Sequence, residues 1–199
     1  TDTDPINIDF LLKSSIFGAP SLKLHDSEAA GKLPFIFAQV DYDPRIPEHY
    51  SMLCFIYFKL MGRQPSGASG THWEDIGFQG IAPQTDINRS MKMLAVLQMV
   101  HLVDQHLHFA QRLHRLSRAH LSTSPGRLSW PLFCVSIAFT KITLDVFRSG
   151  ALNKECNRQK AVLNVLHEMH LACFHALASK CDRPAQDKMQ ADYLEEVRK

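Results

Sequence analysis

One segment constrains the fold of this chain more than any other: MKMLAVLQMVHLV, at positions 91–103. Its apolar residues fall on all sides of a helical wheel and not on a single stripe, which is typical of a helix enclosed by its neighbours. A helix of this kind needs apolar faces on several other elements to cover it. The segment therefore predicts a central helix, with the remaining segments as candidates for the surrounding layer.

Most of the remaining segments also have helical patterns. Apolar residues at helical spacing, often bounded by proline or glycine, mark the ranges 4–18, 47–62, 105–121, 129–149 and 153–181. The short apolar run 35–40 fits either a short helix or a strand. Because convincing strands are scarce, the sequence predicts an all-α fold with about six to eight helices. We expect one compact domain over residues 1–183, with 184–199 as a polar C-terminal helix or tail.

Composition narrows the class of protein. Of the 199 residues, 45% are hydrophobic and 21% are charged, which is ordinary for a globular domain. A net charge of +2 does not indicate a nucleic-acid partner. The five cysteines contain no Cys-x-x-Cys pair, a pattern that favours reduced thiols and a cytoplasmic location over disulfides or a zinc site.

The longest apolar run, 130–147, contains Lys141 and Asp145 and therefore predicts a buried helix instead of a membrane span. The i,i+4 spacing of these two residues also allows an ion pair. No Gly-x-x-x-x-Gly-Lys loop is present, and the histidines lack the His-Glu-x-x-His spacing. The sequence therefore predicts neither a GTPase nor a metal centre, and it indicates no cofactor.

The segment THWEDIGFQGIAPQTDINRS, at 71–90, concentrates unusual residues between two helical patterns. We expect Trp73 and Phe78 to insert into the helical core. Gly77 and Gly80 are expected to adopt backbone conformations that a side chain would forbid. The segment is therefore predicted to be an irregular connector whose aromatic residues fix it to the core.

Helix capping accounts for a second part of this segment. Pro83 begins a turn, and Thr85 or Asp86 is positioned to accept hydrogen bonds from the first N–H groups of the next helix. Arg89 then falls in the first turn of the central helix, where the helix dipole does not favour a cation. We therefore expect Arg89 to have another purpose, either catalytic or structural through Asp86 or Glu74.

The same segment resembles the signature of the ELMO domain. In that signature a tryptophan and three residues precede Gly-Phe-Gln, and three more residues precede Pro-x-Thr-Asp and an arginine. Seven residues match it in register: Trp73, Gly77, Phe78, Gln79, Pro83, Thr85 and Asp86. FGAPSL, YFKLMG, RLSR and ECNRQ resemble further family segments in the same order. The resemblance covers residues 10–180 and looks closer to the short ELMO-domain-only proteins than to the long engulfment adaptors.

The resemblance implies that the chain is a GTPase-activating protein for a small GTPase of the Arf/Arl family in its GTP form. In such proteins the arginine of the motif is the essential residue, which implies a catalytic role for Arg89. An arginine supplied in trans raises the rate of GTP hydrolysis by about 10³ to 10⁵, because it stabilises charge on the phosphoryl oxygens. The seven motif residues and Asn88 would then shape the site or contact the partner.

The chain departs from the family pattern beside the arginine. The family has one residue between the aspartate and the arginine, then glycine directly after the arginine and again two residues later; here INRSMK follows Asp86. Without a gap Asn88 takes the arginine position, and with one inserted residue Arg89 keeps it. The insertion preserves the apolar positions of the central helix, but it places Ser90 and Lys92 where glycines are expected.

This departure supports a second hypothesis, in which the chain is a non-catalytic ELMO-domain scaffold or adaptor in a cytoskeletal or ciliary (axonemal) assembly. A basic flank on the helix 105–121 is a further candidate for contact: Arg112, Arg115 and Arg118. These arginines fit peripheral association with an acidic membrane, contact with a phosphorylated partner, or the more common case of a solvated helix face.

Overall fold

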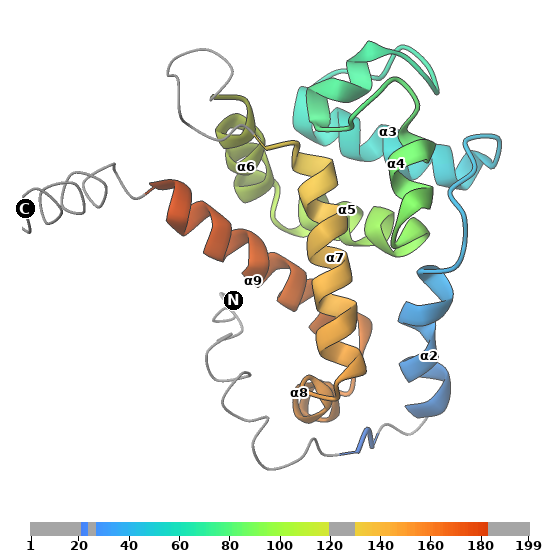
Figure 1. Ribbon diagram of the computed structural model, residues 1–199, viewed down its shortest axis with the longest axis vertical. Coiled ribbons are helices and arrows are strands. Elements are labelled where there is room, and N and C mark those ends of the chain that lie inside the picture. Colours follow the sequence, from blue (N-terminus) through green and yellow to red (C-terminus); the bar gives the residue numbers. More distant parts are fainter. Residues whose placement is uncertain (1–20, 24–26, 120–129, 183–199) are drawn as a thin grey trace, which may run out of the picture.

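Helices make up all the regular structure in residues 21–23, 27–119 and 130–182, the ranges that the computed structural model describes (Figure 1). Their bounds are α2 Ser27–Phe37, α3 Pro47–Met61, η2 Thr71–Ile76, α4 Pro83–Arg89, α5 Lys92–Gln105, α6 Leu107–Ala119, α7 Leu132–Arg148, α8 Asn153–Gln159 and α9 Leu163–Asp182. The η2 element is a 3-10 helix, and the others are α-helices. The prediction of an all-α fold is confirmed.

The central position predicted for the segment 91–103 is also confirmed. Helix α5 lies in the middle of the molecule and contacts α2, α3, α4, α6, α7 and α9. Buried residues occur on all of its sides: Met93, Leu94, Ala95, Val96, Gln98, Met99, Leu102 and Val103. Because α5 is covered from every direction, the surrounding helices have a common surface on which to pack.

The core has two parts, and α7 belongs to both. The first part contains residues of α3, η2, α4, α5 and α6 together with Leu132 and Phe133 at the start of α7. The second contains Leu144 and Phe147 near the end of α7, packed with residues of α8 and α9. Figure 1 shows the same arrangement, with α8 beside the end of α7 and far from η2 and α3.

Two helix breaks differ from the sequence expectations. The range 153–181, expected as one element, is divided because Lys160 has φ of 54° and ends α8. Helix α4 is separate from α5, because Ser90 is extended and Met91 has φ of 63°. The apolar run 35–40 belongs to α2 as far as Phe37. The expected elements at 4–18 and 184–199 lie outside the described residues.

Candidate functional site

The connector between α3 and α4 is fixed to the core by two aromatic residues. Trp73 is fully buried, and its indole Nε1 donates a hydrogen bond to the Gly67 carbonyl at 3.1 Å. Phe78 stacks on Phe133 of α7 with the ring centroids 4.1 Å apart, and it meets Trp73 edge to face at 6.1 Å. Both aromatic residues lie in the core, in agreement with the sequence expectation.

Gly77 brings the connector into direct contact with the start of α7. It has φ of +93°, and a Cβ atom there would lie 2.2 Å from the Leu132 nitrogen. The Gly77 carbonyl accepts a hydrogen bond from the Cys134 N–H at 3.2 Å. Gly80 differs from the expectation: its φ is not positive, and an added Cβ would meet no atom within 4 Å.

Helix α4 turns polar residues toward solvent at the edge of this connector. Pro83 is buried at its first turn, as is common because proline lacks an N–H. Asp86 and Ile87 point inward and are buried, whereas Thr85 and Arg89 are exposed. Arg89 therefore lies in the last turn of a separate short helix, and not in the first turn of α5 as expected; the helix dipole favours a cation at this end.

Asp86 is the buried carboxylate of the site. Its Oδ2 accepts a hydrogen bond from the backbone N–H of Gln79 at 2.7 Å, so it does not cap α5 as the sequence suggested. The thiol of Cys134 lies 3.8 Å from the same oxygen. Burial, followed by the Asp86 charge, raises the pKa of Cys134 to about 12, so this thiol stays protonated and is available as a donor. Asp86 thus joins the connector, α4 and α7.

Arg89 extends outward from this buried carboxylate. Its side chain is 64% exposed, and its Nη2 lies 3.7 Å from Asp86 Oδ1. Its Nη1 donates a long hydrogen bond to Gln79 Oε1 at 3.4 Å. Long contacts of this kind are weak, so they define a resting position for the guanidinium without holding it firmly.

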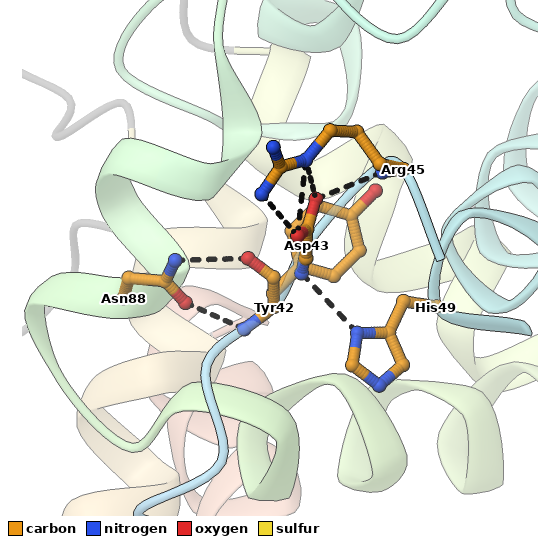
Figure 2. A network of polar contacts seen from close by, with 5 residues as sticks. All are labelled: Tyr42, Asp43, Arg45, His49 and Asn88. Carbon is orange, nitrogen blue, oxygen red and sulfur yellow. Dashed lines mark hydrogen bonds and ion pairs between the residues drawn. The ribbon is translucent and has the colours of Figure 1, made fainter. Parts of the chain in front are cut away.

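Asn88 has the opposite orientation. Its Oδ1 accepts a hydrogen bond from the Tyr42 N–H at 2.7 Å, and its Nδ2 donates to the Tyr42 carbonyl at 2.9 Å. Figure 2 shows that Asn88 faces the connector before α3, where Arg45 contacts Asp43 and His49 accepts from the Asp43 N–H. Both polar groups of the Asn88 amide are therefore engaged within the chain.

The two residues after Ser90 have an uncommon backbone. Met91 and Lys92 have φ of 63° and 46°, in the left-handed region that glycine adopts most readily. In either register, one of them falls on the second glycine of the family pattern. The Lys92 side chain forms an ion pair with Asp41 at 2.8 Å and bonds the Gln39 carbonyl at 3.4 Å. These contacts connect the start of α5 to the segment before α3.

The basic flank proposed on α6 contacts the connector between α3 and α4 through Arg118. Arg112, Arg115 and Arg118 are all exposed on α6. Arg118 forms an ion pair with Asp75 of η2 at 3.1 Å, and Arg63 pairs with the same carboxylate at 3.2 Å. Across the described ranges, no helix is both long and apolar enough to cross a membrane.

Several histidines lie between α5, α7 and α9 and not at the motif. His101 stacks on His167 with the ring centroids 4.2 Å apart, and His170 Nε2 lies 2.9 Å from the Ser136 hydroxyl. Burial lowers the pKa of both His167 and His170 to about 3, so both are neutral. The described residues contain no group of three or more histidines, cysteines or carboxylates suited to a metal ion.

The structure therefore brings some of the expected site residues together and separates others. Gln79, Asp86 and Arg89 meet at one surface, with Thr85 exposed nearby on α4. Trp73, Gly77, Phe78 and Pro83 support this surface from the core. The contact of the Asn88 amide with the Tyr42 backbone was not predicted, because no local pattern links two positions 46 residues apart.

Comparison with known proteins supports the resemblance of this chain to the ELMO domain. The model of the ELMO/CED-12 family matches residues 36–193. ELMO domain-containing protein 3 of Homo sapiens is 37% identical over 171 residues, which cover 84% of this chain and 42% of that protein. ELMO domain-containing protein 2 of Mus musculus is 31% identical over 129 residues, which cover 64% of this chain and 39% of that protein. No solved structure gives a significant match. The chain spans less than half the length of these two relatives. The family match over residues 36–193 and the 37% identity show that the chain belongs to the ELMO/CED-12 family.

Proposed function

We propose that this domain stimulates GTP hydrolysis by a small GTPase of the Arf/Arl family in its GTP form, with Arg89 as the arginine supplied in trans. The observation that carries the proposal is the contrast between two neighbours on α4. The Arg89 guanidinium is 64% exposed, whereas the Asn88 amide is engaged with the Tyr42 backbone. This contrast supports Arg89, and not Asn88, as the residue that reaches the nucleotide.

The chemistry requires a cation that is positioned but still able to move. During hydrolysis, negative charge develops on the oxygens around the transferred phosphoryl group, and a guanidinium stabilises it with two directed N–H donors. Arg89 rests against Asp86 at 3.7 Å and against Gln79 at 3.4 Å. A charge-assisted hydrogen bond from the guanidinium to a phosphate oxygen is stronger than either of these long contacts. Arg89 can therefore exchange its resting contacts for contacts with the nucleotide at a small cost in free energy.

The test is single-turnover GTP hydrolysis by a panel of Arf and Arf-like GTPases with the domain in excess. Arg89→Lys is expected to lower the stimulated rate by about 10³-fold, because lysine lacks the planar pair of donors. Arg148→Lys is the matched control: Arg148 is 60% exposed, ends helix α7 and faces an aspartate three residues earlier, as Arg89 does on α4. Equal loss in both variants, or none in either, would contradict a catalytic Arg89.

A non-catalytic scaffold in a cytoskeletal or ciliary assembly is the second candidate. The observation that favours it is that Ser90 and Lys92 place side chains beside Arg89, where the family pattern has glycine. We also propose a cytoplasmic location, with cytoskeletal or ciliary association under this second candidate. A folded domain that stimulates no GTPase of the panel, yet retains partners after Arg89→Ala, would favour the scaffold.

A further inference from the structure

We propose that Gln79 is a second catalytic residue of the same surface, which orients the attacking water while Arg89 stabilises the phosphoryl oxygens. The inference rests on the proposed function and goes beyond it, because it assigns this domain two groups supplied in trans instead of one. Three features support it: the position of Gln79 beside Arg89, the rigid support beneath both residues, and the chemistry of a primary amide.

The position of Gln79 is defined by the same carboxylate that faces Arg89. Asp86 Oδ2 accepts the Gln79 backbone N–H at 2.7 Å, and Asp86 Oδ1 lies 3.7 Å from the Arg89 guanidinium. The two side chains meet directly, with Arg89 Nη1 3.4 Å from Gln79 Oε1. Because Asp86 is only 7% exposed and belongs to a packed helix, it fixes the spacing between the two groups.

The backbone on both sides of Gln79 is suited to presenting its side chain. Phe78 is buried on Phe133, and Gly77 is packed against the start of α7, so the preceding residues cannot move freely. Gly80 follows, and an added Cβ there would meet no atom within 4 Å. Gln79 therefore projects from a fixed loop beside open space, which leaves room for the backbone of a partner.

The side chain of Gln79 contributes little to the fold. It is exposed, and among the described residues its amide makes one side-chain hydrogen bond, the long one to Arg89. A glutamine that only stabilised the loop would need no exposed amide, since the backbone N–H already bonds Asp86. The amide is thus available to another molecule once Arg89 turns toward its phosphate.

A primary amide has the groups that this reaction needs. Its oxygen accepts a hydrogen bond from the attacking water, and its NH₂ donates one to a γ-phosphoryl oxygen. The water oxygen forms a bond to the γ-phosphorus, and the bond from that phosphorus to the β–γ bridging oxygen breaks. The electron pair of that bond stays on the bridging oxygen of GDP, and the water proton passes to the released phosphate. Gln79 is unchanged at the end.

The decisive experiment uses a GTPase that lacks its own water-orienting residue. Small GTPases generally orient the water with a glutamine, and its replacement by leucine removes that function. If Gln79 performs this role in trans, the wild-type domain should stimulate the glutamine-to-leucine GTPase nearly as strongly as the GTPase that keeps its glutamine. Gln79→Ala is expected to lower that stimulated rate by about 10²-fold or more, the usual range for a group that orients or accepts the reacting proton.

Two controls separate catalysis from binding and folding. Gln105→Ala removes an exposed amide from the far end of α5 and is expected to leave the stimulated rate unchanged. Titration of the domain in single turnover distinguishes the maximal rate from the half-saturating concentration. Loss of a catalytic amide lowers the maximal rate, whereas loss of a binding contact raises the half-saturating concentration. Gln79→Asn, whose arm is one methylene shorter, is expected not to restore the rate.

The outcomes distinguish this inference from the proposed function. Stimulation of the wild-type GTPase that depends on Arg89, with none for the glutamine-to-leucine GTPase and an unchanged rate for Gln79→Ala, would overturn the role of Gln79 and leave that of Arg89 intact. A folded wild-type domain that accelerates no GTPase would overturn both. Stimulation of the glutamine-to-leucine GTPase that disappears in Gln79→Ala would support both.

Discussion

The surface around α4 and the interface between α7 and α9 both place polar groups on well-packed helices, but they expose them to opposite degrees. At α4, the buried Asp86 supports two exposed side chains, Gln79 and Arg89. Between α7 and α9, His170 and Ser136 bond each other at 1% and 0% exposure. The difference separates exposed polar groups with weak contacts from buried polar groups that bond each other, and each kind responds to a different perturbation.

The largest expected effect comes from Gly77, which supports the α4 surface from below. Gly77→Ala would place a Cβ atom 2.2 Å from the Leu132 backbone nitrogen at a residue with φ of +93°. Overlap with a main chain cannot be relieved by turning a side chain, and the left-handed backbone adds its own cost. We expect the free energy of unfolding to fall by about 3 kcal/mol or more, measured by chemical denaturation.

Gly80→Ala is the matched control for this substitution. It is the same chemical change three residues later, in open space and without a positive φ. The free energy of unfolding should change by less than about 0.5 kcal/mol. Similar losses at both glycines would show that the close approach to α7 is not what makes position 77 sensitive.

The next largest effect concerns pH and belongs to the histidine interface. Burial lowers the folded-state pKa of His167 and His170 from the ordinary 6.5 to about 3. Between these values the unfolded chain binds protons that the folded chain does not, so stability is full above pH 6.5 and falls as the pH decreases. Each histidine is expected to remove about 2 kcal/mol between pH 7 and pH 5.

A paired substitution tests which groups cause this pH dependence. His170→Leu with Ser136→Ala removes one titrating group together with its hydrogen-bond partner, so no buried polar atom of the pair remains. The loss of stability between pH 7 and pH 5 should shrink by about 2 kcal/mol. Ser136→Ala alone keeps the titrating imidazole and should retain the slope. An unchanged slope in the double variant would assign the effect to other groups, such as His101.

The third effect contrasts Asn88 with Arg89 at the α4 surface itself. Asn88→Ala leaves the Tyr42 N–H and carbonyl without their side-chain partners, which should lower the free energy of unfolding by about 1 to 3 kcal/mol. Arg89→Lys keeps a cation at an exposed position and should change it by less than about 0.5 kcal/mol. The reverse ranking, obtained from denaturant titrations, would contradict the assignment of an inward Asn88 and an outward Arg89.

Much of the fold could be predicted because its helices bury one face or all faces. The ranges 47–62, 105–121 and 129–149 correspond to α3, α6 and α7 within a few residues. The breaks at Lys160 and Met91 could not be predicted, since lysine and methionine rarely adopt a positive φ. At the start of α5, the contacts of Lys92 with the segment before α3 help to hold that conformation, and such tertiary contacts leave no local pattern.

The candidate site could be predicted as a set of residues but not as a geometry. The family resemblance named Gln79, Asp86 and Arg89, which the structure brings together, yet the residue pattern placed Arg89 at the start of the central helix and not at the end of α4. The same pattern suggested Thr85 or Asp86 as a helix cap, whereas the Asp86 carboxylate accepts the Gln79 N–H seven residues earlier. Both errors have one cause: the break between α4 and α5 depends on the backbone of Ser90 and Met91.

The smallest expected effect lies on the outer face of α7, opposite in character to its buried histidine contacts. Lys141 and Asp145 form the i,i+4 ion pair expected from the sequence, with Nζ and Oδ2 2.8 Å apart and side chains 61% and 45% exposed. Hydrogen bonding to Lys141 lowers the pKa of Asp145, but water and salt screen a pair this exposed.

A double-mutant cycle with Lys141→Ala and Asp145→Ala should give a coupling energy below about 0.5 kcal/mol that decreases further in high salt. Because Arg148 also contacts Asp145 at 2.6 Å, the single variants should not be equivalent: Asp145→Ala removes two ion pairs, and Lys141→Ala removes one. A coupling energy above about 1 kcal/mol would mean that exposed charges matter to this helix as much as its buried polar contacts do.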